Sequence, residues 1–175
     1  MSDGKLRLTQ DTISGLKYRT QYAVAQVPTH KDEDTWAVYD GAKHGFGNMA
    51  GAVFMVCDGH GGKHAAAMCQ KQLIMQLKES HTEVASNLDT AGAEGGDRPQ
   101  KSLKAKLADR NNWMGNGMDT AIEEAFRVMD LEVKRYTTAG TTCSVVICRD
   151  DPLDDTELSS ADPSVMLKCA WVGDS

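Results

Sequence analysis

The sequence lacks an apolar run long enough to cross a membrane as a helix, which takes about 20 residues. Its N-terminal stretch, MSDGKLRLTQDTISG, has no apolar signal core, and Ser2 stands where N-myristoylation requires a glycine. A positive net charge is also absent, because 19 basic residues against 25 acidic ones give a net charge of -6. We therefore expect a cytoplasmic or nuclear protein whose main partner is neither a membrane nor a nucleic acid.

A CxxC pair is missing as well, and the number of cysteines is odd. Most of them lie inside apolar stretches such as FMVC and CSVVIC. Free cysteine is among the most buried residue types, so we interpret these cysteines as reduced core residues and expect no zinc site. The cysteines are Cys57, Cys69, Cys143, Cys148 and Cys169.

What the sequence does have is enough apolar material for one domain: 175 residues, of which 41% are hydrophobic. The patterns predict two strands joined as a hairpin, then a strand buried on both faces, two amphipathic helices, and a final antiparallel pair of strands. In chain order these elements lie at 22–27, 35–39, 52–57, 65–78, 118–137, 143–148 and 165–172. Because strands and helices do not alternate strictly, we expect an α+β layered sandwich and not a doubly wound parallel sheet.

The segment from about 80 to 117 interrupts these patterns. It is first polar and small, then basic, and shows no sustained periodicity. We interpret most of it as a surface insertion. Trp113, isolated within it, is expected to anchor it to the body of the domain or to mark a contact with a partner.

Two acidic segments carry the candidate chemistry. The first is the turn Asp32-Glu33-Asp34, and the second is Asp58-Gly59-His60-Gly61-Gly62, directly after a buried strand. Carboxylates are the ligands that Mg²⁺ and Mn²⁺ prefer, and glycines let the main chain approach an ion. An Asp-Gly pair alone also fits an ordinary tight turn, and an acidic turn alone fits a solvated loop, so each gains weight from the other.

Four elements in one order produce a resemblance: KDEDTW, FMVCDGHGG, the segment AIEEAFRVMDLEVKRYTTAGTTCSVVIC, and CAWVGDS. This order resembles the type 2C (PPM) metal-dependent serine/threonine protein phosphatases over about 22–175, apart from the insertion. The resemblance implies a sandwich of two antiparallel sheets flanked by helices. It also implies that residues 1–175 are the N-terminal part of a single catalytic domain whose substrate is a phosphoprotein.

The resemblance further implies a centre of two Mg²⁺ or Mn²⁺ ions. Carried onto matching positions, Asp58 would bridge both ions, Gly59 would offer its carbonyl, and Glu33 and Asp34 would hold metal-bound waters. Asp174 would lie near a third, weaker metal site. A metal-activated water would attack phosphorus, and His60 would be the general acid for the departing oxygen. The alternative for His60 is a histidine that only braces the turn.

The sequence departs from the family pattern in two places. Family members usually carry a phosphate-gripping arginine where this chain has Thr29, and the neighbouring His30 and Lys31 are the candidates to replace it. Family members also continue beyond the position of Ser175 with further metal-binding aspartates. We therefore expect weak metal binding and little activity from this chain alone, and an unmatched sheet edge open to association.

Two other interpretations remain at this point. In the first, the chain is a non-catalytic pseudophosphatase or a protein-interaction module, which the threonine at position 29 favours. In the second, it is an ordinary soluble domain whose turns coincide with the family pattern.

Overall fold

The computed structural model describes residues 7–27, 31–89, 103–154 and 164–173, which form two antiparallel sheets and four helices. The α+β layered sandwich expected from the sequence is confirmed. Its elements are β1 (Arg7–Ile13), β2 (Thr20–Gln26), β3 (Thr35–Asp40), α1 (Gly41–His44), β4 (Ala52–His60), α2 (His64–Asp89), α3 (Leu103–Met114), α4 (Asn116–Tyr136), β5 (Gly140–Asp150) and β6 (Val165–Val172).

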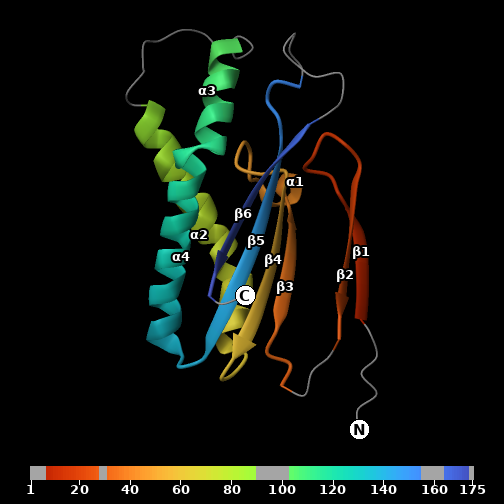
Figure 1. Ribbon diagram of the computed structural model, residues 1–175, viewed down its shortest axis with the longest axis vertical. Helices are drawn as coiled ribbons and strands as arrows, with labels where there is room; N and C mark the ends of the chain where they lie inside the picture. The colour runs from red at the N-terminus through yellow and green to blue at the C-terminus, as the bar shows by residue number, and fades with distance from the viewer. Residues whose placement is uncertain (1–6, 28–30, 90–102, 155–163, 174–175) are drawn as a thin grey trace.

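The main sheet has four strands in the order β3-β4-β5-β6, and β1 and β2 form a separate two-stranded sheet. Figure 1 shows the layers side by side: the long helices, then the main sheet, then the small sheet. The expected antiparallel pairing of the last two strands is confirmed. The expected hairpin between the second and third strands is wrong, because β2 pairs with β1 and β3 pairs with β4. The partner strand β1 was missed because six of its seven residues are exposed, so it shows no alternation of apolar and polar residues.

The helices α2 and α4 pack against one face of the main sheet (Figure 1). The predicted apolar stripe of α2 is buried at Ala65, Cys69, Leu73 and Leu77. Alternate residues of β4 point toward this helical layer, which gives the domain its principal core. Among the helices of the described ranges, none combines the length and apolarity needed to span a membrane.

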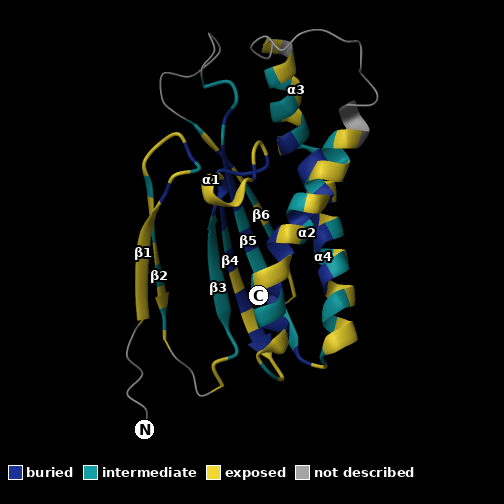
Figure 2. Ribbon diagram, turned by 180° about the vertical axis from the view of Figure 1, so that it is seen from behind, coloured by how far each residue is buried: buried dark blue, intermediate teal, exposed yellow. Residues whose placement is uncertain are grey.

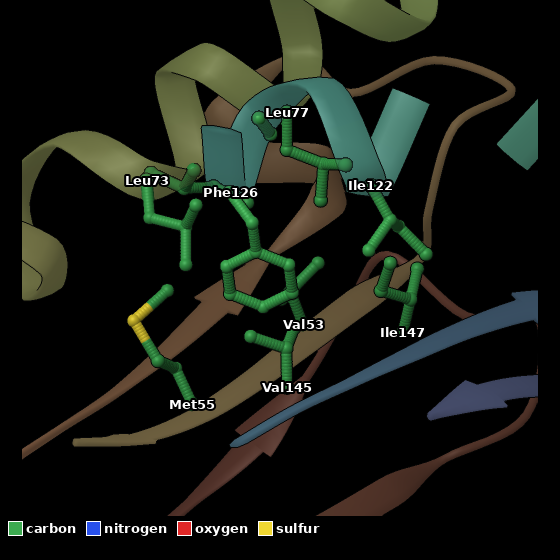
Figure 3. A pocket seen from close by; sticks show the side chains of 10 residues that line it. Val53, Met55, Leu73, Leu77, Ile122, Phe126, Val145 and Ile147 are labelled. Carbon is green, nitrogen blue, oxygen red and sulfur yellow. The ribbon is translucent and has the colours of Figure 1, made fainter. Parts of the chain in front are cut away.

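A small cavity of about 10 Å³ remains between the helices and the sheet (Figure 3). A single water molecule needs at least ~10–15 Å³ of such space and several polar partners. The lining here is entirely apolar, so the cavity stays dry. The side chains around it come from β4, α2, α4 and β5: Val53, Met55, Leu73, Ile74, Leu77, Ile122, Ala125, Phe126, Val145 and Ile147.

The opposite face of the main sheet is covered only in part. Ile13 and Leu16 of the small sheet and its loop bury Ala52 and Cys148 at one end. Beyond this cover, Val56 is 58% exposed. Leu167 and Trp171 of β6 and the thiol of Cys169 are exposed as well. The prediction that the strand at 52–57 is buried on both faces is therefore wrong at Val56, and the prediction of a buried cysteine is wrong at Cys169. Figure 2 shows that buried and exposed stretches alternate along β4.

The described part of the segment from 80 to 117 is helical. The helix α2, expected to end near Lys78, continues to Asp89, and α3 forms a further helix. Trp113 of α3 is 1% exposed, and its indole N–H donates to the carbonyl oxygen of Met49 at 2.7 Å. Ion pairs of Asp109 with Arg149 and of Arg110 with Asp151 also tie α3 to the body. Trp113 is thus the anchor that the sequence suggested, while residues 90–102 lie outside the described ranges.

Candidate active site

The Asp58-Gly59-His60 segment is the end of a strand and not a turn. The sequence places a break at Asp58-Gly59, but β4 stays paired with β5 through His60, with Asp58 opposite Thr142 and His60 opposite Gly140. The ladder of β5 thus overrides the turn preference of an Asp-Gly pair. The chain turns only at Gly61 and Gly62, whose φ angles of 71° and 129° are accessible mainly to glycine.

Gly59 brings the two acidic segments together. A Cβ atom built on Gly59 would lie 2.4 Å from the carbonyl oxygen of Glu33, so the main chain of the acidic turn packs directly against this glycine. The last pair of the β3–β4 ladder is Thr35 with Cys57. Continued by one position, the same register sets Asp34 beside Asp58. The predicted adjacency of the two acidic segments is therefore present in the fold.

The donors at this edge are carboxylates that suit a hard divalent cation. Asp58 is exposed, and Glu33 and Asp34 are half-buried. Carboxylate oxygens and a close main-chain approach suit Mg²⁺ or Mn²⁺ in donor chemistry. In the described part of the chain, however, no three His, Cys, Asp or Glu side chains converge as a metal-binding group. Asp174, assigned to the third site, lies outside the described residues.

Thr141 is a residue of this edge to which the sequence assigned no role. Its hydroxyl group lies 2.9 Å from the carbonyl oxygen of Asp58 and 2.8 Å from the carbonyl oxygen of Thr142, and it can donate to either. Thr141 of β5 thus contacts the peptide that links Asp58 to Gly59. The GTT triplet marked this position in the family pattern, but only the register of β4 with β5 shows what the hydroxyl contacts.

His60 lies at the exposed end of β4 with its imidazole against Gly140. A Cβ atom at position 140 would lie 2.2 Å from Nε2 of His60. Only a residue without a side chain leaves room for the ring in this position.

Replacing Gly140 with alanine should therefore displace the imidazole of His60 while lowering the free energy of unfolding by only about 1 kcal/mol, since a side chain can rotate away more easily than a backbone. The imidazole signals of His60 in a ¹H–¹³C NMR spectrum measure the displacement. Gly47→Ala is the control for the His60 signals, because a Cβ there meets nothing within 4 Å. It is not a control for stability, because the φ angle of 56° at Gly47 strains any residue with a side chain. Unchanged His60 signals in the Gly140 variant would contradict the packing described.

The predicted substrate-binding pair is described only in part. Lys31 is exposed, and His30 lies outside the described residues. A groove of about 750 Å³ opens between the small sheet, the acidic turn and α2. Three cationic side chains line this groove, which the sequence gave no reason to combine: Arg7, Lys63 and Lys71. Asp32 and Asp34 of the acidic turn line it as well, so the groove carries both positive and negative charge.

Comparison with known proteins agrees with this arrangement. A search of curated proteins finds no match. A comparison with protein families matches residues 26–175 to Protein phosphatase 2C. The match covers most of the chain and includes both acidic segments and all four strands of the main sheet. The chain belongs to the protein phosphatase 2C family.

Proposed function

We propose that this chain is the N-terminal part of a single catalytic domain of a protein serine/threonine phosphatase. The domain would hydrolyse phosphoserine or phosphothreonine in a phosphoprotein with Mg²⁺ or Mn²⁺. The observation that supports the proposal best is the packing of the Glu33 main chain against Gly59, which sets the two acidic segments on one sheet edge. Membership of the phosphatase family supports the reaction class.

Asp58 and the carbonyl group of Gly59 would hold the cations, with Glu33 and Asp34 accepting hydrogen bonds from the surrounding water. When bound, the two ions lower the pKa of water and neutralise the charge of the phosphate oxygens. Thr141 would help to position the peptide next to the Asp58 carboxylate when its hydroxyl group donates to the Asp58 carbonyl oxygen. The weak metal binding expected of this chain alone stays a prediction.

His60 would donate the proton to the serine or threonine oxygen as it leaves phosphorus. Its ring is exposed at the end of β4, two residues after Asp58, and the absence of a side chain at position 140 leaves the ring in place. Imidazole changes its protonation near neutral pH, which suits a general acid. Lys31 would meet the phosphate, with Arg7 and Lys63 of the groove as further cations near the substrate.

Removal of the metal tests the proposal. In the full-length protein, a chelator should reduce hydrolysis of a phosphothreonine peptide to the uncatalysed rate, and excess Mn²⁺ should restore it, because the proposed reaction depends on a water molecule activated by the cations. Phosphate release measures the rate, and far-UV circular dichroism controls for unfolding by the chelator. A rate unaffected by the chelator would contradict metal dependence. A folded protein that binds Mn²⁺ without any turnover would instead favour the non-catalytic interaction module.

A further inference from the structure

Two buried thiols face each other directly beneath the acidic edge. Cys57 of β4 and Cys143 of β5 occupy opposite positions of the antiparallel ladder. Their sulfur atoms are 3.4 Å apart, and the residues are 0% and 1% exposed. Cys57 immediately precedes Asp58 on β4, and Cys143 immediately follows Thr142, which is the partner of Asp58 in the ladder.

The backbone at this pair already suits a disulfide. Opposite residues of antiparallel strands have Cα atoms about 4.5–5.5 Å apart. Disulfides span Cα separations of about 4.4–6.8 Å. The bond therefore needs only a rotation of the two side chains, which shortens the sulfur separation from 3.4 Å to about 2.0 Å without moving the strands.

A pocket gives small molecules a route to the pair. This pocket of about 260 Å³ lies between the end of α4 and the start of β5, and His60, Thr141 and Cys143 are part of its lining. A peroxide is no larger than a few atoms and fits such a space. The pocket thus joins the surface next to His60 to the otherwise buried sulfur of Cys143.

The other cysteines are less suited to this reaction. Cys69 also lines the pocket, but it lies on α2, and the sulfur-to-sulfur contact that the structure shows is the one between Cys57 and Cys143. Cys148 is buried on the opposite face of the sheet, where its directly opposite neighbours are Ala52 and Leu167. Cys169 is exposed and has no thiol directly opposite it in the ladder, where its partner is Val146.

We propose that Cys57 and Cys143 are an oxidation site that forms a reversible disulfide with a peroxide as oxidant. One sulfur attacks a peroxide oxygen and breaks the O–O bond, giving a sulfenic acid and one water. The second sulfur then displaces the sulfenic oxygen as another water, so two thiols lose two electrons and two protons and the peroxide is reduced to two waters. The site is independent of the proposed phosphatase reaction, although it lies on the strand that carries Asp58.

Mass mapping after oxidation tests the proposal in the 175-residue chain with Cys169→Ser, which removes the exposed thiol. Treatment with hydrogen peroxide, alkylation of remaining thiols under denaturing conditions and digestion should yield a peptide that joins positions 57 and 143, with the loss of two hydrogen atoms. A reductant should release it. The bond closes a loop between residues 86 positions apart, so the oxidised chain should also unfold at a higher temperature than the reduced chain.

Matched variants decide the assignment. Cys143→Ser should abolish the cross-linked peptide, whereas Cys148→Ser, at another buried position of the same strand, should leave it unchanged. The peptide map of the chain that carries only Cys169→Ser shows whether the disulfide forms, even if one of the other variants fails to fold. The proposal is overturned if both thiols remain open to alkylation after peroxide has fully oxidised added glutathione. A cross-link made by Cys69, or a sulfinic acid in place of the disulfide, would also overturn it.

Discussion

Replacing Asp58 with asparagine should weaken Mn²⁺ binding by about 100-fold or more, since even residues that only orient metal ligands typically contribute about 10–100-fold to affinity. The amide keeps the size of the side chain and removes its charge. Asp58 is exposed at the sheet edge and lies beside the acidic turn, so the substitution changes a proposed metal ligand and leaves the core intact. Mn²⁺ titration followed by electron paramagnetic resonance measures the affinity, and kcat/KM of the full-length protein should fall with it.

Asp11→Asn is the matched control, because Asp11 is also an exposed aspartate on a strand but belongs to β1, outside the candidate site. It should leave both the Mn²⁺ affinity and kcat/KM unchanged. Equal effects of the two variants would mean that the change reflects net charge alone. Full activity in the Asp58 variant would remove this carboxylate from the mechanism.

Replacing Trp113 with alanine should lower the free energy of unfolding by about 3–5 kcal/mol, the range for truncating a large buried aromatic residue. The indole is 1% exposed, and its N–H is the donor to the carbonyl oxygen of Met49. The substitution therefore creates a cavity between α3 and the body of the domain and also leaves a buried acceptor without its partner. Urea unfolding followed by circular dichroism measures the loss.

Two further variants separate these contributions. Trp113→Phe keeps an aromatic ring and removes the donor, so it should cost less than the alanine variant. Trp171→Ala changes a tryptophan that is 66% exposed and should alter stability by no more than about 0.5 kcal/mol. A loss for Trp113→Ala no larger than that for Trp171→Ala would show that α3 does not stabilise the domain through this residue.

The two long helices could be predicted because their apolar residues repeat with the period of a helix. In α4 the predicted apolar side Ile122, Phe126, Met129 and Val133 is buried or half-buried. The strands of the main sheet could be predicted because they are short runs rich in apolar residues. The strand β1 and the helix α3 could not. Six of the seven residues of β1 are exposed, and α3 is held by a single tryptophan and by ion pairs between residues far apart in the sequence.

The candidate site could be predicted from its residue types more readily than from its geometry. The glycine and carboxylates of the two acidic segments indicated that the segments meet, and the contact of Gly59 with Glu33 confirms this. The role of Gly140 and of the hydroxyl group of Thr141 depends on the register of β4 with β5, which no local pattern specifies. The same register determines that Cys57 and Cys143 are neighbours, so the thiol pair also became visible only in the fold.

The three tryptophans differ in their exposure to solvent, so their fluorescence can report separately on different layers of the fold. Trp113 is enclosed beneath α3, Trp36 is half-buried on β3, and Trp171 is open to solvent on β6. Iodide quenches indole fluorescence by collision. As its concentration rises, it should quench the emission of Trp171 first and that of Trp113 last. Any molecule that binds over the exposed face of the main sheet should protect Trp171 from iodide and leave the quenching of Trp113 unchanged.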